Sequence, residues 1–351
     1  MQRWFRETLI YSVWTALRVI SIIFAAAVLL GAVAAPLPGA AGAAFARDEA
    51  ARPRFGISMP SFRENRWQLD MQAFQNDALT RGVDILVRFA GNDPAQQNLQ
   101  IKEMVNIGID ALIVAPTDVF ACVEGVRYAK SRKVPVISYD RLAENCAVDA
   151  YVAFEREGVG ELMGRYLAAR APRGGYILLR GPAADSNAKG FFAGAMEYIG
   201  PLVRSGAVTV LFEGEVAGWR ADAAEALVDA VLEKTVAVNA VLAPNDDTAG
   251  GVIRALQRKG LAGTVHVTGQ DATPEGLARI DDGLQGMTVF KDTNALARKA
   301  AVVALRMARG KKVVPDTLTP NGFGDIPTFV LPVMSVNKES LPYMLRLPEL
   351  E

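Results

Sequence analysis

The chain has 351 residues, of which 51% are hydrophobic and 22% charged, a composition that excludes wholesale disorder and low-complexity structure. Its 38 basic residues balance its 38 acidic ones, which argues against a nucleic-acid-binding protein. One histidine, His266, and two cysteines, Cys122 and Cys146, leave little material for a zinc site or a Cys/His nucleophile pair. At about 150 residues per domain, the length predicts two domains.

Residues 1–46 differ from the rest of the chain. They contain four charged side chains, and the run from Val19 to Ala35 is apolar or small throughout. A basic start, an apolar centre and the small-residue end Ala44-Phe45-Ala46 predict a secretory signal peptide that is cleaved after Ala46. The alternative is a membrane anchor, because about 17 apolar residues is the lower limit for a bilayer-spanning helix. Both interpretations place the remaining chain outside the cytoplasm.

From Phe55 onward, short apolar segments alternate with segments of helical periodicity. Ten segments have the composition of strands: FGISM, DILVRFA, DALIVAP, VPVISYD, YVAF, GYILLRG, VTVLFEG, AVLAP, VHVTGQD and MTVFKD. Strands that alternate with helices predict parallel sheets covered on both faces. Ten strands fit two sheets of about five better than one sheet of ten. The sequence therefore predicts an α/β protein with two doubly wound lobes.

The two cysteines acquire a specific interpretation if the chain is exported. In an oxidising compartment, two cysteines and no others favour a single disulfide, Cys122–Cys146. Both follow predicted strands, so both belong to the carboxyl edge of the same sheet. The alternative, two unrelated thiols, stays open at this point.

Polar and aromatic side chains follow nearly every predicted strand, where the ligands of open α/β sheets bind. The candidates are Arg66, Trp67, Asp140, Arg141, Asp185, Asn187, Trp219, Asn245, Asp271 and Lys291. Carboxylates that accept and Arg, Lys or Asn groups that donate hydrogen bonds suit the hydroxyls of an uncharged polyhydroxy ligand. Two indole rings suit the C–H faces of a sugar ring. The alternative for any single Asp or Asn is an ordinary helix cap, but such caps do not explain the whole set.

An enzymatic role is the competing interpretation. Asp140, Asp185 and Asp271 could form the carboxylate pair of a glycosidase. The cations Arg141, Lys189 and Lys291 nearby would lower the pKa of these acids, whereas a catalytic acid needs a raised pKa. A nucleophile elbow, a phosphate-binding loop and a dinucleotide fingerprint are all absent from the sequence. We therefore predict no catalytic residue, no metal site and no cofactor.

Several segments together resemble one family, the periplasmic sugar-binding proteins of ABC transporters with the type I fold, and especially its xylose-binding members. They are RENRWQLD, YDRL, DSNAKGFFAGAM, VAGWRADAA, APNDDTAGGVIRAL, TGQDATPEGLARI and GMTVFKD. The resemblance implies a periplasmic monomer whose two lobes close on one monosaccharide and which delivers it to an inner-membrane permease. It also implies that the ten residues above contact the sugar. One departure is Phe154-Glu155-Arg156-Glu157, where the family has Phe-Asp-Asn-Glu.

The same resemblance implies three chain crossings between the lobes, near 154–155, 289–291 and 322–327. The expected N-terminal lobe comprises residues 54–154 and 292–322, and the expected C-terminal lobe residues 155–290 and 325–351. A sensor that docks to a chemoreceptor or histidine kinase would use the same lobes, so this alternative stays open. A transcription repressor would need an N-terminal helix-turn-helix, and the apolar leader occupies that place.

Overall fold

The computed structural model describes residues 52–344, which belong to one compact unit beginning at Arg52. The predicted signal peptide or anchor, residues 1–46, lies outside the described residues. Between residues 52 and 344, no helix combines the length and the apolar composition needed to cross a bilayer.

A seven-stranded sheet forms the N-lobe, in the order β11-β12-β5-β4-β3-β1-β2. All neighbouring strands are parallel except β11, which pairs antiparallel with β12. The strands are β1 (Arg54–Met59), β2 (Asp84–Phe89), β3 (Ala111–Val114), β4 (Val136–Tyr139), β5 (Ala150–Phe154), β11 (Thr317–Pro320) and β12 (Asp325–Leu331). Helices cover this sheet: α2 (Asn65–Arg81), α3 (Pro94–Ile107), α4 (Val123–Ser131) and α10 (Thr293–Ala308).

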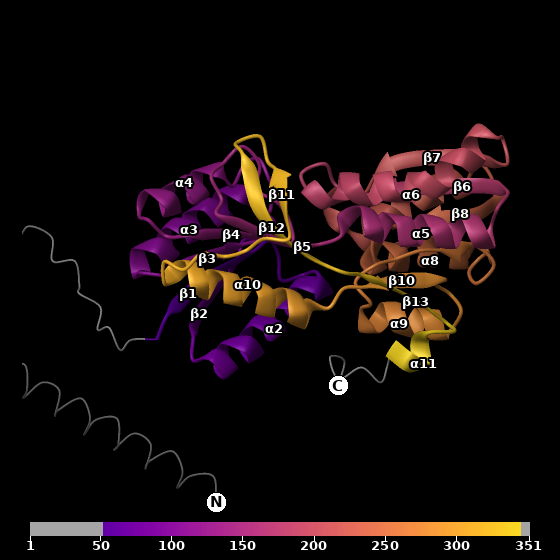
Figure 1. Cartoon of the computed structure of the whole chain (residues 1–351). Coiled ribbons are helices and arrows are strands. Elements are labelled where there is room, and N and C mark those ends of the chain that lie inside the picture. The colour runs from indigo at the N-terminus through magenta and orange to yellow at the C-terminus, as the bar shows by residue number, and fades with distance from the viewer. Residues whose placement is uncertain (1–51, 345–351) are drawn as a thin grey trace, which may run out of the picture. The chain divides into compact units, whose positions relative to one another are not determined.

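Two apolar clusters bury the two faces of this sheet. Successive side chains of a strand point to opposite faces, and β3 shows the consequence: Ala111 and Ile113 belong to one cluster, while Leu112 and Val114 belong to the other. Because both faces are buried, β3 is a continuous apolar run without polar alternation. Figure 1 shows α10, β11 and β12, from the C-terminal third of the chain, beside the N-terminal strands of this lobe.

The C-lobe contains a four-stranded sheet in the order β7-β6-β8-β9 and an antiparallel pair, β10–β13. Its strands are β6 (Gly174–Arg180), β7 (Val208–Glu215), β8 (Val238–Leu242), β9 (His266–Val267), β10 (Met287–Phe290) and β13 (Met334–Asn337). Its helices are α5 (Arg156–Arg170), α6 (Ser186–Arg204), the 3-10 turn η1 (Ala217–Trp219), α7 (Ala221–Leu232), α8 (Asp246–Arg258), α9 (Pro274–Asp281) and α11 (Leu341–Met344). The predicted class, two doubly wound α/β lobes, is confirmed.

The chain passes between the two groups of strands three times. The first two passages, β5 to α5 and β10 to α10, follow Phe154 and Phe290, close to the positions expected from the sequence. The third lies between Leu331 and Met334, because β12 pairs with β5 and so belongs to the seven-stranded sheet. The segment expected to be the third crossing instead forms the β11–β12 hairpin, whose turn holds Gly322 at a φ of 79°. Glycine adopts this left-handed conformation without a steric penalty.

The two cysteines lie together on the N-lobe but are not bonded in the structure. Cys122 precedes α4 and Cys146 lies between β4 and β5, with exposed fractions of 1% and 4%. Both are free thiols. A hydrogen bond with Cys146, together with burial, raises the pKa of the Cys122 thiol. The side chains are therefore neighbours, as their shared sheet edge predicts, whereas the predicted disulfide is absent from the structure.

Candidate functional site

All ten residues singled out from the sequence line one pocket. The pocket is small, with a cavity volume of about 30 Å³. Its lining comprises Arg66, Trp67, Asp140, Arg141, Asp185, Asn187, Trp219, Asn245, Asp271 and Lys291, together with Glu64, Phe191 and Gln270. Each of the ten predicted residues is less than 10% exposed. Parallel strands bring these side chains together because their carboxyl ends share one edge of each sheet.

Arg66, in the first turn of α2, is the cation with the most carboxylate partners. Its guanidinium pairs with Asp70 one turn along the helix, with Asp140 Oδ1 at 3.0 Å and with Asp271 Oδ1 at 3.4 Å. Burial alone would lower the pKa of Arg66, but these carboxylates raise it above its ordinary value. The Tyr139 hydroxyl also donates a hydrogen bond to Asp70. Arg66 is therefore held charged and in a fixed orientation by groups from both lobes.

Asp140 follows β4 in a left-handed conformation, with a φ of 61°. Its Oδ2 accepts a hydrogen bond from Asn187 Nδ2 at 3.0 Å, and its carbonyl oxygen accepts one from the Tyr151 hydroxyl at 2.9 Å. Burial would raise the pKa of Asp140, but the charges of Arg66, Lys291 and Arg141 lower it. This carboxylate is therefore an ionised hydrogen-bond acceptor at neutral pH.

A second ion pair joins Arg141 to Asp185, with 2.6 Å between Nε and Oδ2. Asp185 is also the N-cap of α6, where its Oδ1 accepts the Asn187 amide at 2.9 Å. The Trp219 indole donates to Asp185 Oδ2 at 3.2 Å. Burial raises the pKa of Asp185 although Arg141 opposes this effect. Asp185 thus acts as a helix cap and also holds two of the pocket's side chains.

Two indole rings line the pocket, one on each lobe. The Trp67 ring lies 5.0 Å from the Arg141 guanidinium, and its Nε1 donates to Glu64 Oε2 at 2.7 Å. The Trp219 ring lies against Gly181, where an added Cβ would come within 2.3 Å of it. Both indole nitrogens are hydrogen-bonded, so what the rings still offer a ligand is their faces and edges.

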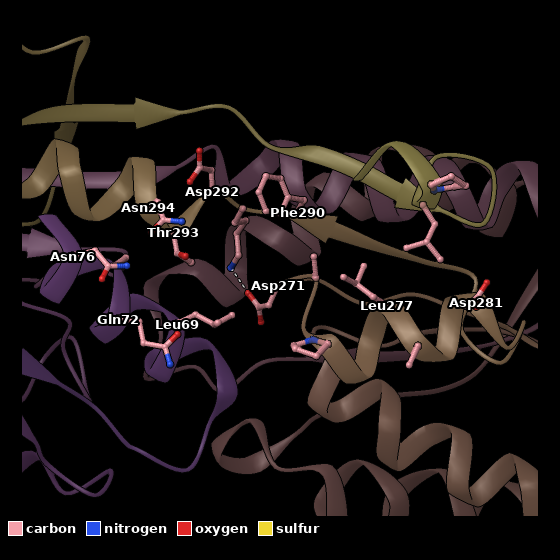
Figure 2. A pocket seen from close by; sticks show the side chains of 17 residues that line it. Leu69, Gln72, Asn76, Asp271, Leu277, Asp281, Phe290, Asp292, Thr293 and Asn294 are labelled. Carbon is pink, nitrogen blue, oxygen red and sulfur yellow. Dashed lines mark ion pairs between the residues drawn. The ribbon is translucent and has the colours of Figure 1, made fainter. Parts of the chain in front are cut away.

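Asp271 and Lys291 form a further ion pair in the lining of the pocket. Their charged atoms are 2.7 Å apart, the contact drawn as a dashed line at Asp271 in Figure 2. Asp271 has a φ of 96°, and its amide donates to Val289 O at 2.8 Å. Lys291 is 5% exposed and lies over the rings of Phe154 and Phe191, at 5.9 and 5.7 Å.

Asp246, which the sequence did not assign to the site, fixes the backbone that carries Asp271. Its Oδ2 accepts the Thr273 amide at 2.9 Å, and its Oδ1 accepts Gln285 Nε2 at 2.7 Å and Thr288 Oγ1 at 2.8 Å. Asp246 is fully buried, and burial together with the charge of Asp271 raises its pKa to about 7. Beside it, Asn245 caps α8 by accepting the Thr248 amide at 2.9 Å.

Two buried acceptor atoms in the pocket lack a hydrogen-bond partner within the described residues, Asn187 Oδ1 and Gln270 Oε1; the buried donor Arg141 Nε also lacks a hydrogen bond but is ion-paired with Asp185. An unpaired buried acceptor costs about 1–3 kcal/mol, so such atoms are usually satisfied by something that binds. Both atoms are hydrogen-bond acceptors, and the hydroxyl groups of a sugar can donate hydrogen bonds to them. The pocket therefore combines unpaired acceptors, ionised donors and acceptors, and aromatic faces.

Three lining residues were missed from the sequence, for different reasons. Gln270 immediately precedes Asp271, so the strand-end rule could have found it. Glu64 precedes α2 and is indistinguishable in the sequence from an ordinary loop acid. Phe191 is in the interior of α6, where its apolar character indicates a core position.

A family model described as "Periplasmic binding protein domain" matches residues 55–312. The chain belongs to this family. Its members and the homologues found are substrate-binding receptors, so the protein is not an enzyme, and the glycosidase alternative is excluded.

Two relatives of this periplasmic binding protein are D-xylose-binding periplasmic proteins, from Haemophilus influenzae and Escherichia coli. Each is 36% identical over 289 residues, which is 82% of this chain and 87% and 88% of the respective relatives. A solute-binding protein of a carbohydrate transporter from Chloroflexus aurantiacus, solved with D-glucose, is 27% identical with a TM-score of 0.80. The match covers 84% of this chain and 96% of that one.

Proposed function

We propose that this protein is an exported receptor that encloses one monosaccharide, D-xylose or a related aldose, and delivers it to an ABC permease. The ten predicted residues would be its sugar contacts. The observation that supports this most is the pocket itself: three cations and three carboxylates are buried around two indole rings, and two acceptors lack partners. Delivery to an ABC permease is the usual role of the family.

The identity of the sugar rests on the relatives. D-xylose is the ligand named for the two relatives at 36% identity, whereas the Chloroflexus aurantiacus protein was solved with D-glucose. A pentopyranose and a hexopyranose differ by one hydroxymethyl group. A site built to hydrogen-bond each hydroxyl discriminates strongly against a ligand that leaves a buried group unpaired. We therefore expect a narrow preference among aldoses.

A thermal-shift screen of the chain from Arg47 tests the proposal. The ligands are D-xylose, D-glucose, D-ribose and L-arabinose, with myo-inositol and amino acids as controls. A ligand at 100 times its Kd adds about 2.7 kcal/mol, which raises the Tm by several degrees. A selective increase with xylose supports the proposal as written, and one with another aldose changes only the sugar. If no sugar raises the Tm, the receptor proposal is wrong.

Loss of a transport receptor and loss of a sensor have different effects on a cell. Loss of a transport receptor abolishes growth on the bound sugar at low concentration, whereas loss of a sensor leaves uptake intact and removes a response. Growth and chemotaxis of a strain lacking this gene separate the two. We expect lost growth, and normal growth with lost signalling would favour the sensor.

The proposal includes a monomeric receptor, which size-exclusion chromatography with light scattering tests.

Export would follow from a signal peptide cleaved after Ala46. The homologues are periplasmic proteins, which supports the periplasm as the compartment. N-terminal sequencing of the protein from a periplasmic extract should begin at Arg47. Recovery of the full-length chain from the membrane fraction would instead support the anchor.

The adjacent thiols of Cys122 and Cys146 would form a disulfide in that compartment. Closing a loop of about 24 residues contributes on the order of 3 kcal/mol in the chain-entropy model. Mass spectrometry of the non-reduced periplasmic protein should find the two peptides linked. Two alkylatable thiols after denaturation would exclude the bridge.

A further inference from the structure

Residues that do not line the pocket also form hydrogen bonds between the two lobes. Asn65, the first residue of α2 in the N-lobe, donates from its Nδ2 to Glu275 Oε2 at 3.0 Å. Glu275 belongs to the first turn of α9 in the C-lobe. Neither side chain lines the pocket, although Asn65 stands between the pocket residues Glu64 and Arg66 in the chain. The pair therefore joins the lobes beside the site without entering it.

A second group of contacts joins the loops after β3 and β4 to the start of α6. The Leu142 amide donates to the Ser186 hydroxyl at 2.9 Å, and the Val119 amide donates to Ala184 O at 3.1 Å. Leu142 and Val119 are each 1% exposed. Leu142 and Ser186 are both adjacent in the chain to a pocket residue, yet neither lines the pocket. We call these two hydrogen bonds, together with Asn65–Glu275, the closure contacts.

We propose that the closure contacts set the affinity of the receptor by stabilising the closed lobes without touching the sugar. This inference rests on the proposed function, since it concerns the closing of the lobes on a sugar. The apparent Kd of a ligand that binds only the closed form is its intrinsic Kd divided by the closed fraction. A contact that exists only in the closed form therefore lowers the Kd of every sugar by the same factor, whereas a pocket group discriminates between sugars.

The chemistry of the closure contacts indicates the size of their effect. When the lobes separate, each donor and acceptor exchanges its partner for water. The net gain from such an exchange favours the bonded state by a factor of about 2 to 10 for each hydrogen bond. The Ser186 hydroxyl is available for this contact because Asp185, and not Ser186, caps α6 by accepting the Asn187 amide.

Alanine variants of Asn65, Glu275 and Ser186 test the inference in the chain from Arg47. Calorimetry measures the Kd of each variant for D-xylose and for D-glucose, or for the two aldoses that raise the Tm most. Hydrogen exchange of single amides in the sugar-free protein measures how often the lobes separate, under conditions where the exchange rate is proportional to the open fraction.

The Val119 amide is the reporter of opening, because its acceptor, Ala184 O, belongs to the other lobe and is left unchanged in all three variants. The Glu144 amide is the internal control. It donates to Val119 O at 2.8 Å, within the N-lobe, so its exchange should be the same in the variants and in the wild type. Faster exchange at Glu144 would indicate a general loss of stability in this part of the N-lobe.

Each single variant should reduce the ratio of closed to open protein by about 2- to 10-fold. The fold increase in Kd multiplied by the fold increase in Val119 exchange equals this reduction, whether the free protein is mostly open or mostly closed. We therefore expect a product of about 2 to 10 for each variant, and the same increase in Kd for both sugars.

Double variants separate the individual contacts. Asn65→Ala combined with Glu275→Ala should have no larger effect than either change alone, because both remove the same hydrogen bond. Asn65→Ala combined with Ser186→Ala should multiply the two effects, because the contacts share no atom. Asp282→Ala is the matched control for Glu275, since Asp282 is an exposed acid that follows the same helix. Figure 2 shows the preceding residue, Asp281, at the end of α9 away from α2, so the control should give a product of one.

A product of one for all three single variants, in a protein that binds sugar, would overturn the inference and leave the receptor function intact. A changed ratio of the two Kd values would also overturn it, because the residues would then take part in recognising the sugar. If the wild type binds no sugar, the proposed function itself is wrong. The sugar-free exchange is then decisive, and unchanged exchange at Val119 would exclude the closure contacts as well.

Discussion

Arg66, Arg141 and Lys291 lie buried among four carboxylates, those of Asp70, Asp140, Asp185 and Asp271. A buried charge is tolerated only when it is paired and hydrogen-bonded. Each of the three cations has at least one ion-pair partner among these acids, so their side chains are already positioned before any ligand arrives. A sugar can then bind by adding hydrogen bonds to groups whose orientation is already fixed, which reduces the cost of ordering them.

Replacing Asp271 with Asn should weaken sugar binding by about 10- to 100-fold. The substitution keeps the shape of the side chain but removes the charge that pairs with Lys291 at 2.7 Å and with Arg66 at 3.4 Å. Truncating a buried charge pair typically costs about 2 kcal/mol or more. Isothermal calorimetry with the sugar found in the thermal screen measures the change. Asp222→Asn, an exposed position on the same lobe, is the control, and wild-type affinity of the Asp271 variant would show that this pair does not serve binding.

Asp246 should make the stability of the protein fall as the pH rises from 5 to 7. Its pKa is about 7 in the folded protein, against the ordinary value of 3.8 that applies to the unfolded chain. Between pH 5 and 7 the folded chain therefore retains a proton that the unfolded chain has lost. Stability then decreases with increasing pH, by on the order of 2 kcal/mol between pH 5 and 7. The carboxyl groups facing Asp246 include Asp271, and Arg279 donates to its backbone oxygen.

Urea unfolding of the wild type and of Asp246→Asn at pH 5 and pH 7 measures this contribution. The difference between the two proteins should change by about 2 kcal/mol across the window, whatever the constant cost of the substitution. Asp222→Asn is the control, because the pKa of Asp222 is lowered to about 2 and lies below the window. Parallel pH profiles for the wild type and the Asp246 variant would exclude the raised pKa.

At the scale of elements, helices α5 and α6 cross at glycines. A Cβ on Gly160 would lie 1.9 Å from the carbonyl oxygen of Phe191, and one on Gly194 would lie 2.1 Å from that of Glu157. These backbones approach so closely that only glycine fits. Asp185 caps α6 and Asn187 lies in its first turn, so this packing also fixes the position of two pocket residues.

Gly160→Ala should therefore lower the free energy of unfolding by about 1–3 kcal/mol, despite the better helix propensity of alanine. Gly158, on the same helix, is the matched control, because a Cβ there meets chiefly the flexible side chain of Glu155 at 3.1 Å. Gly158→Ala should leave the stability unchanged or slightly increased. Chemical denaturation of both variants gives the comparison, and equal effects of the two substitutions would contradict the close helix crossing.

The sequence predicted the first ten strands well but did not predict the last three. The ten apolar segments correspond to β1–β10, because buried parallel strands are continuous apolar runs between helices. The strands β11, β12 and β13 were not predicted, and the sheets have seven, four and two strands instead of about five each. The segment 321–327 contains the glycines and proline of a hairpin turn, which resemble those of a hinge in sequence. The pocket residues were found because they follow strands, as Asp246 does beside Asn245, whereas Asp70 lies in the interior of α2, where position gives no such signal.

At the scale of the molecule, Arg66 connects groups from both lobes. Asp70 and Asp140 belong to the N-lobe, and Asp271 belongs to the C-lobe. If the lobes separate, Arg66 loses Asp271 but keeps Asp70 and Asp140, so opening does not leave Arg66 without an acidic partner. Asp271 likewise keeps Lys291. This arrangement allows an open state at modest electrostatic cost, and a ligand that contacts both lobes then favours the closed state.

Small-angle X-ray scattering should accordingly show a smaller radius of gyration with saturating sugar than without it. The three passages that join the lobes, after Phe154, Phe290 and Leu331, are short enough for a rotation to be absorbed by a few backbone angles. In Asp271→Asn the decrease should require more sugar, because Arg66 loses the C-lobe carboxylate that it contacts only when the lobes are closed. An amino acid that gives no thermal shift serves as the control solute. An identical radius of gyration with and without sugar in the wild type would mean that the lobes are already closed in the free protein, and that the ligand selects no new state.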